Sequence, residues 1–176
     1  VCDEVPSPRG GSWGSDGNIY FAPRSNSTIW KVPASGGTAT EVTQKSREKG
    51  EINHRWPYVL GDDGVMLFSA WTGPGTDEHQ ILRQSLKTGE RQVLIQGGDS
   101  PRYHPSGYLL YNHEDKLFAV PWHPSQTAVD SAAPIALPIY PRSLGEGVAI
   151  FDLSKNGTLV YAAGGANRYT RRLVWV

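Results

Sequence analysis

One nine-residue pattern occurs four times along this 176-residue chain and constrains its fold more than any other feature. The copies occupy residues 13–21, 60–68, 103–111 and 153–161. Each copy contains a glycine that follows a short polar residue, and these glycines are Gly17, Gly64, Gly107 and Gly157. They lie 47, 43 and 50 residues apart. A pattern repeated at a nearly constant spacing indicates a chain built from repeated structural units.

The residues around each glycine indicate a tight turn followed by a strand. A short polar residue before glycine favours a hairpin turn, because glycine adopts positive φ without steric cost. Apolar side chains two and four residues after the glycine share one face of the following strand. The positions four before, two after and four after the glycine are, copy by copy, Trp13, Ile19 and Phe21; Leu60, Met66 and Phe68; Tyr103, Leu109 and Tyr111; and Leu153, Leu159 and Tyr161.

The residue between these two strand positions is also apolar or aromatic, which indicates a strand that is buried on both faces. These residues are Tyr20, Leu67, Leu110 and Val160. A sheet of such strands must be covered by another sheet on either side. Further strand-forming segments follow the copies, at residues 28–33 and 38–43, 80–86 and 91–95, 116–121 and 134–139, and 171–176.

Four-stranded sheets that stack at a repeat of about 40–50 residues are typical of β-propeller blades. We therefore predict an all-β fold of about four blades in one partial propeller domain, at residues 7–44, 52–97, 98–140 and 146–176. The last repeat lacks its outer strand, and residues 1–5 are the candidate to supply it, from the same chain or from a second one. No segment shows helical periodicity, so almost no helix is expected.

Composition disfavours several classes of partner and cofactor. The 17 basic and 17 acidic side chains cancel, so no nucleic-acid partner is expected. No apolar run approaches the roughly 20 residues of a membrane span, so no membrane insertion is expected. The sequence has a single cysteine, Cys2, and its five histidines lack the close spacing of a zinc site. Neither a metal nor a cofactor is therefore predicted.

The sequence contains no motif for nucleophilic catalysis. None of its serines lies in a Gly-x-Ser-x-Gly elbow, and no strand-to-helix turn is predicted that would strain such a serine. Cys2 has no matched base, and adjacent carboxylates such as Asp77 and Glu78 fall in polar loops. No catalytic residue is predicted, and we expect a non-enzymatic module.

Three arginines in or beside first strands are the candidate binding residues. Arg55 is followed by Trp56, and Arg9 precedes the equivalent strand of the first repeat. Arg102 is followed by Tyr103. First strands line the channel of a propeller, so these side chains could form a basic ring at one mouth, where arginine would bind carboxylate or phosphate. The alternative is that each arginine pairs with a carboxylate or carbonyl of a neighbouring blade and braces the ring.

Segments 9–17, 30–37 and 55–57 resemble the TolB-like, WD-repeat-like β-propellers of bacteria, in particular the propeller regions C-terminal to some bacterial serine/threonine kinases. The resemblance covers nearly the whole chain. It implies a propeller fold, a scaffold or ligand-sensing role and an extracytoplasmic (periplasmic or extracellular) location. The alternatives are a propeller associated with a prolyl-oligopeptidase-like or glycosidase-type hydrolase, or a sugar-binding propeller lectin that uses Trp71 or Trp122.

The number of repeats has a consequence for assembly, because propellers of the family usually have six or seven blades. An open stack of about four blades exposes the apolar flanks of its first and last sheets, which favours association. We expect a homodimer that completes an eight-bladed ring. The alternatives are a fragment of a longer propeller and a closed four-bladed ring. The further partner expected of the assembly is a protein or a small ligand that the sequence does not identify.

Overall fold

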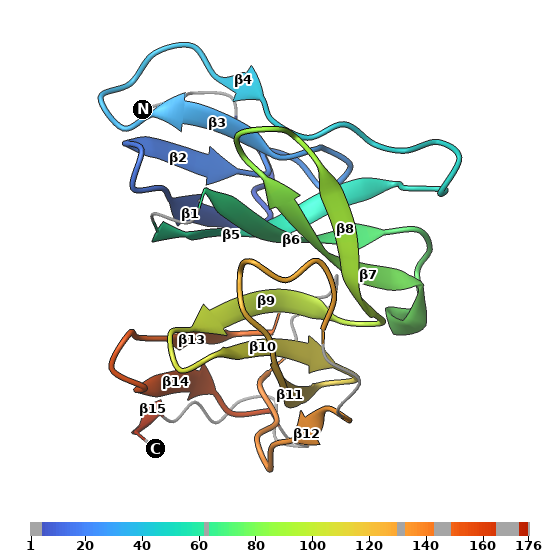
Figure 1. Ribbon diagram of the computed structural model, residues 1–176, viewed down its shortest axis with the longest axis vertical. Coiled ribbons are helices and arrows are strands. Elements are labelled where there is room, and N and C mark those ends of the chain that lie inside the picture. Colours follow the sequence, from blue (N-terminus) through green and yellow to red (C-terminus); the bar gives the residue numbers. More distant parts are fainter. Residues whose placement is uncertain (1–4, 62–63, 130–132, 143–148, 165–172, 176) are drawn as a thin grey trace.

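The computed structural model describes residues 5–61, 64–129, 133–142, 149–164 and 173–175, which form four antiparallel β-sheets (Figure 1). The first sheet contains β1 (Gly11–Trp13), β2 (Asn18–Phe21), β3 (Trp30–Pro33) and β4 (Thr40–Glu41). The second contains β5 (Asn53–Leu60), β6 (Val65–Trp71), β7 (His79–Ser85) and β8 (Arg91–Gln96). The third contains β9 (Asp99–His104), β10 (Tyr108–His113), β11 (Lys116–Pro121) and β12 (Ile135–Ala136). The fourth contains β13 (Phe151–Leu153), β14 (Leu159–Ala162) and β15 (Leu173–Trp175).

Strands that follow one another in the chain also pair with one another in every sheet, so each sheet is a series of hairpins. This confirms the prediction of an all-β fold with one sheet for each repeat. The fourth sheet has three strands within the described residues, as expected for a blade without its outer strand. Residues 1–4 of the predicted closing segment lie outside the described residues, and Val5 belongs to no strand.

Helical structure contributes very little to the described part of the chain. The segment Thr76–Glu78 forms a short 3₁₀ turn between β6 and β7. No helix within the described residues has the length and the apolar composition needed to cross a membrane.

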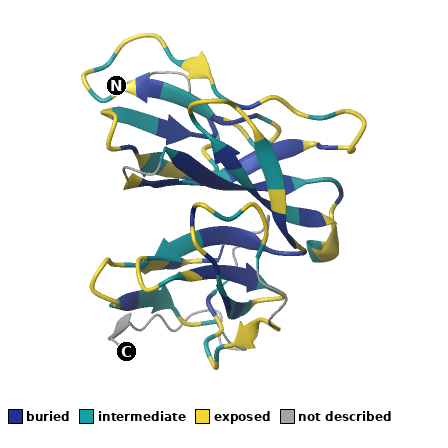
Figure 2. Cartoon of the chain, in the orientation of Figure 1, coloured by how far each residue is buried: buried dark blue, intermediate teal, exposed yellow. Residues whose placement is uncertain are grey.

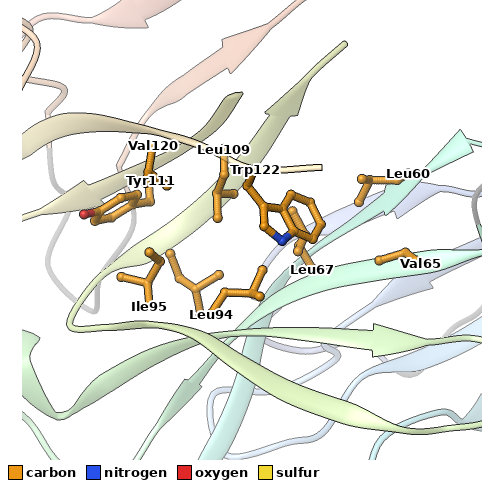
Figure 3. Packing of buried hydrophobic residues seen from close by; sticks show 10 residues of the cluster. Leu60, Val65, Leu67, Leu94, Ile95, Leu109, Tyr111, Val120 and Trp122 are labelled. Carbon is orange, nitrogen blue, oxygen red and sulfur yellow. The ribbon is translucent and has the colours of Figure 1, made fainter. Parts of the chain in front are cut away.

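Apolar layers join the sheets into a stack that follows their order in the chain (Figure 1). The layer between the first and second sheets contains Tyr20, Ile29, Met66, Phe68 and Leu82. The layer between the second and third sheets contains Leu67, Ile81, Leu109, Tyr111 and Trp122 (Figure 3). The layer between the third and fourth sheets contains Leu110, Leu117, Phe151 and Leu159.

The strand β6 shows why a sheet covers each face of its neighbour. All residues from Val65 to Ala70 are buried, and their side chains alternate between the two faces. Met66 and Phe68 pack against the first sheet, and Leu67 packs against the third. Full burial of each such side chain contributes about 1.5–3 kcal/mol of transfer free energy. Figure 2 shows the same burial along the centres of the second and third sheets.

The register of the second sheet corrects the alignment on Leu60. Val59, and not Leu60, pairs with Met66, the residue two after the glycine. The physical reason is one extra residue in the turn: residues 61–64 separate the paired Leu60 and Val65, whereas residues 105–107 separate the paired His104 and Tyr108. The structurally equivalent positions in the four first strands are therefore Trp13, Val59, Tyr103 and Leu153.

In each of the first three sheets, a residue with left-handed backbone lies three positions before the equivalent residue of the first strand, which is Trp13, Val59 or Tyr103. The φ angles are 87° at Gly10, 53° at Trp56 and 55° at Ser100. The ladder between first and second strands shifts register at the latter two positions, as a β-bulge does. Left-handed backbone is costly for a residue as bulky as Trp56 and persists only where surrounding contacts enforce it. One such contact joins the Trp56 N–H to the Arg9 carbonyl at 2.9 Å.

Candidate functional site

The first strand of each sheet, called here the inner strand, lies beside the first strand of the next sheet. These strands are β1, β5, β9 and β13, and Figure 1 shows them following one another along one side of the stack. One equivalent position in each strand contributes a polar side chain. The four residues are Ser12, Tyr58, Arg102 and Asp152, and they are called here the inner-strand row.

Contacts between neighbouring sheets connect the members of the inner-strand row. The Val59 N–H donates to Ser12 Oγ at 2.9 Å, which joins the first sheet to the second. The Arg102 guanidinium lies 5.4 Å from the centroid of the Tyr58 ring. Arg102 Nε–H then donates to Asp152 Oδ1 at 3.0 Å, which joins the third sheet to the fourth. Side chains of four consecutive sheets are thus aligned at one level.

Arg102 carries the positive charge of this row. Its Nη1–H donates to the Pro101 carbonyl at 2.9 Å, and a second ring, that of Phe151, lies 5.7 Å from the guanidinium carbon. The Arg102 side chain keeps 22% of its surface exposed, and that of Asp152 keeps 76%. A guanidinium held between aromatic rings and still open to solvent can bind a carboxylate or phosphate.

Tyr58 adds a neutral donor to the row. Burial raises the pKa of the Tyr58 phenol, an effect that Asp152 reinforces and Arg102 partly opposes. The hydroxyl is therefore protonated at neutral pH, and it donates a hydrogen bond to the Tyr103 carbonyl at 3.2 Å. The Tyr103 ring meets the Trp122 ring edge-on, with centroids 5.6 Å apart. The aromatic side of the row is thereby anchored in the second apolar layer.

The five predicted binding residues lie at two different levels of the inner strands. Arg102 and Tyr103 belong to the level of the row. Arg9 and Arg55 are equivalent to each other and lie three residues earlier, on the other side of the left-handed residue. Trp56 follows Arg55 and packs against Gly10, where an added Cβ would come within 2.8 Å of its ring. The structure therefore brings these residues together as two groups, and the three arginines do not form one ring of equivalent positions.

Arg55 has the contacts of the bracing alternative. It is buried, and its guanidinium lies 3.8 Å from the centroid of the Trp71 ring. Its Nε–H donates to Asn53 Oδ1 and its Nη2–H to the carbonyl of Ser25, in the connection between β2 and β3, both at 2.8 Å. Arg9 makes local contacts, donating from Nη1 to Ser7 Oγ at 2.9 Å. The group around Arg55 connects sheets and offers a ligand little surface.

A buried acidic group occupies the position equivalent to Arg55 in the third sheet. Asp99 accepts hydrogen bonds from Trp71 Nε1–H at 2.8 Å and from His79 Nδ1 at 2.7 Å. The Trp71 and His79 rings stack with centroids 3.9 Å apart and planes within 6° of parallel. Arg55, Trp71 and His79 therefore form a layered stack whose polar edge is fixed by Asp99. These contacts join the second sheet to the third.

A second buried polar cluster fixes the connection between the first two sheets. Glu51 Oε2 accepts from the Ser46 N–H at 2.6 Å, from His54 Nε2–H at 3.0 Å and from Arg91 Nη1–H at 3.3 Å. Burial alone would raise the pKa of Glu51, but these hydrogen bonds and the positive charge of Arg91 outweigh it and lower the pKa to about 2. The glutamate is therefore charged at neutral pH.

His54 takes part in that cluster as a neutral imidazole. Burial lowers its pKa below the usual 6.5, which outweighs the opposing effect of Glu51. Its Nδ1 accepts from the Thr43 hydroxyl at 2.7 Å, and Thr43 Oγ1 in turn accepts from the Ile29 N–H at 2.9 Å. Every donor in this chain of contacts thus has an acceptor. Within the described residues, no group of three or more His, Cys, Asp or Glu side chains is arranged to hold a metal ion.

Sequence reasoning identified Arg102 and missed the other members of the inner-strand row. Ser12, Arg102 and Asp152 each stand five residues before the turn glycine, so a common spacing could have revealed them. Tyr58 stands six residues before Gly64 because of the extra residue in the second turn. That one-residue shift hid the row from an alignment based on spacing.

No protein-family model and no curated protein sequence matches this chain. Among solved structures, a chain of a nidogen/laminin complex superposes with a TM-score of 0.68 at 15% identity, over 93% of this chain and 58% of that chain. A streptogramin B lyase matches with a TM-score of 0.58 at 16% identity, over 99% of this chain and 56% of that one. Virginiamycin B lyase from Staphylococcus aureus matches with a TM-score of 0.56 at 13% identity, over 98% and 56%.

These matches support a β-propeller-type fold and extend no further at such low identity. The chain spans somewhat more than half the length of the three structures, which is consistent with a partial propeller. Similar structures include lyases, a protease and a sugar dehydrogenase from Streptomyces coelicolor, besides the nidogen/laminin complex. The TolB-like, WD-repeat-like subtype stays a prediction.

Proposed function

We propose that this chain is a non-enzymatic β-propeller module that binds an anionic group of a small ligand or a protein at the inner-strand row, as part of an assembly of two copies. The observation that carries the proposal is the position of Arg102. Its guanidinium lies between the rings of Tyr58 and Phe151 and is partly open to solvent. An arginine in this setting is preorganised to bind a carboxylate or phosphate, because its neighbours already hold the side chain and less conformational entropy is lost on binding.

The resident partner of Arg102 is an exchangeable one. Asp152 is largely exposed, and an ion pair of that kind contributes only about 0–1 kcal/mol. Among the described residues, Arg102 donates from Nε and Nη1, and no acceptor is assigned to Nη2. An incoming anion could therefore use the outer edge of the guanidinium, or replace Asp152, at low cost. Tyr58 and Tyr103 would supply the adjoining aromatic surface.

The side chains best suited to acid–base catalysis support a non-enzymatic role. His79 and Asp99 are buried against each other, as are His54 and Glu51. A catalytic acid or base must come within hydrogen-bond reach of its substrate. In both pairs one ring nitrogen of the histidine is engaged by the carboxylate, and all four side chains are buried away from solvent. The proposal of binding without turnover rests on this engagement and on the missing nucleophile motifs.

The test is a ligand-observed NMR titration with three small probes: benzoate, phenyl phosphate and benzamidine. We expect benzoate or phenyl phosphate to bind the wild-type chain and to bind the Arg102→Gln variant at least about tenfold more weakly, the loss of one charge-assisted contact. Arg83→Gln is the matched control, since Arg83 is also half-buried but lies on β7 and contacts Pro124 and Gln92. That variant should bind as the wild type does.

Two results would contradict the proposal. One is equal binding of the anionic probes by the wild type and the Arg102→Gln variant. The other is turnover in a panel of hydrolase and lyase substrates that the Arg102→Gln variant abolishes, because the row would then belong to an active site. Benzamidine, a cation, reports on non-specific aromatic binding and is expected to be insensitive to the substitution.

A further inference from the structure

The turn between β13 and β14 contains the one Asn-Gly pair of the sequence, Asn156 and Gly157. Both residues are exposed, and Gly157 has a positive φ of 89°. Glycine has no Cβ to shield its backbone nitrogen from the side chain that precedes it. The Gly157 nitrogen can therefore reach the side-chain carbon Cγ of Asn156 and close a succinimide ring with it.

Three hydrogen-bond donors converge on the side-chain oxygen of Asn156. Thr158 donates to Asn156 Oδ1 from its hydroxyl at 3.1 Å and from its backbone N–H at 3.3 Å, the latter bond being shared with Ser154 Oγ. The Ser154 hydroxyl donates to Oδ1 as well. Attack on Cγ places negative charge on Oδ1, and donors already directed at that atom stabilise the charge. The turn therefore assists ring closure as an oxyanion hole does.

The surroundings of Gly157 leave room for the ring. Apart from its chain neighbours, the only atom of the described residues within 4 Å of a Cβ built on Gly157 is His104 Nε2, at 3.7 Å. The Gly157 N–H donates to the Ser154 carbonyl at 3.1 Å, and this bond must open before the nitrogen can attack. Because the bond closes an exposed turn, it opens by local fluctuation at low free-energy cost.

We infer that Asn156 is a site of spontaneous covalent modification, at which the side-chain amide is converted to a carboxylate. The Gly157 nitrogen loses its proton to solvent and bonds to Asn156 Cγ. The bond from Cγ to the amide nitrogen breaks, and that nitrogen takes a proton from solvent and leaves as ammonia. Water then opens the succinimide at one of its two carbonyls, which gives either aspartate or isoaspartate. Water is the only co-reactant, and no group is oxidised or reduced.

The first sheet shows that the turn accepts aspartate, one of the two products. Asp16 precedes Gly17 there, as Asn156 precedes Gly157. Asp16 Oδ1 accepts the backbone N–H of Asn18, two residues further on, at 3.2 Å. Asn156 Oδ1 makes the equivalent contact with the residue two positions after it. Conversion to aspartate therefore keeps the hydrogen bonding of the turn and adds one negative charge.

Isoaspartate, the other product, would alter the inner-strand row. It continues the chain through its side-chain carbon and so adds one atom to the backbone between β13 and β14. Leu153 and Leu159 are the paired residues on either side of this turn, and a longer turn disturbs their register. The strand β13 also carries Asp152, which accepts a hydrogen bond from Arg102. Formation of isoaspartate therefore loosens the hold of the fourth sheet on Arg102.

The test is peptide mapping by mass spectrometry of the folded chain, sampled during incubation at mildly alkaline pH. We expect Asn156 to be converted at least about tenfold faster than Asn26, an asparagine in an exposed turn that serine follows. Thr158→Val keeps the branched side chain and removes one donor to Oδ1. It should slow the conversion of Asn156 about fivefold, the effect of one hydrogen bond to the developing charge.

The variant Asn156→Asp separates the chemistry from an effect on folding. It represents the aspartate product, and we expect its far-UV circular dichroism and urea midpoint to equal those of the wild type. Conversion of Asn156 no faster than that of Asn26 would overturn the inference. A rate that Thr158→Val leaves unchanged would also overturn it, because the turn would then give no assistance. Neither result bears on anion binding at Arg102, which the NMR titration tests separately.

Discussion

The variant Trp122→Ala is expected to lose about 3–5 kcal/mol of unfolding free energy, the range found for deleting a large aromatic side chain from a core. Trp122 is almost completely buried between the second and third sheets (Figure 3). It packs among Leu67, Leu109 and Val120 and takes an edge-on contact from Tyr103. Removing the indole leaves a cavity that rigid strands on both sides cannot close.

The matched control is Trp122→Phe. The Trp122 Nε1–H has no hydrogen-bond partner among the described residues, so phenylalanine forfeits no polar contact and leaves a smaller cavity. We expect this variant to lose less than half of what Trp122→Ala loses. Equilibrium urea denaturation followed by far-UV circular dichroism measures both. A Trp122→Ala variant within about 1 kcal/mol of the wild type would show that the second and third sheets do not pack as described.

Acidification is expected to remove about 3 kcal/mol of stability through Glu51 alone. The pKa of this buried glutamate is about 2 in the folded protein against an ordinary 4.5, because His54, the Ser46 N–H and Arg91 stabilise its charged form. A depressed folded pKa gives stability that is complete above pH 4.5 and is lost as the pH falls towards 2. His54 acts in the same direction from pH 6.5 downward, since burial lowers its pKa also.

The comparison that isolates Glu51 uses Glu51→Gln, which has no carboxylate to titrate. Guanidinium denaturation at pH 6 should show that the wild type is more stable than Glu51→Gln. At pH 3 we expect this difference in unfolding free energy between the wild type and the variant to be smaller by about 2 kcal/mol. Glu48→Gln is the control, because Glu48 is exposed in the same connection. A difference between wild type and Glu51→Gln that stays constant over this range would contradict the described cluster.

The fold could be predicted from sequence because its cause is local and repeated. A polar residue before glycine specifies a turn, and Gly17, Gly107 and Gly157 do adopt positive φ. Apolar residues on both faces of the following strand require a sheet on either side, and β6 meets this requirement. These signals recur in all four repeats, so a misaligned residue in one repeat does not change the fold that the other repeats indicate.

The candidate site was less accessible because its contacts cross sheets. The contacts of Arg55 are with Trp71 in the same sheet and with the Ser25 carbonyl in the β2–β3 connection, and no local pattern encodes either contact. The role of Asp152 depends on Arg102, fifty residues away. The extra residue in the second turn displaced Tyr58 by one position, which spacing alone does not reveal.

The register shared by the four inner strands underlies the binding site proposed for this chain. Nuclear Overhauser measurements on isotope-labelled protein test that register most directly. We predict a contact between the Val59 amide proton and the Ser12 β-protons, and a second contact between the Tyr58 ring and the Arg102 side chain. A contact from Ser12 to the Leu60 amide instead, with the Tyr58 ring remote from Arg102, would contradict the inner-strand row.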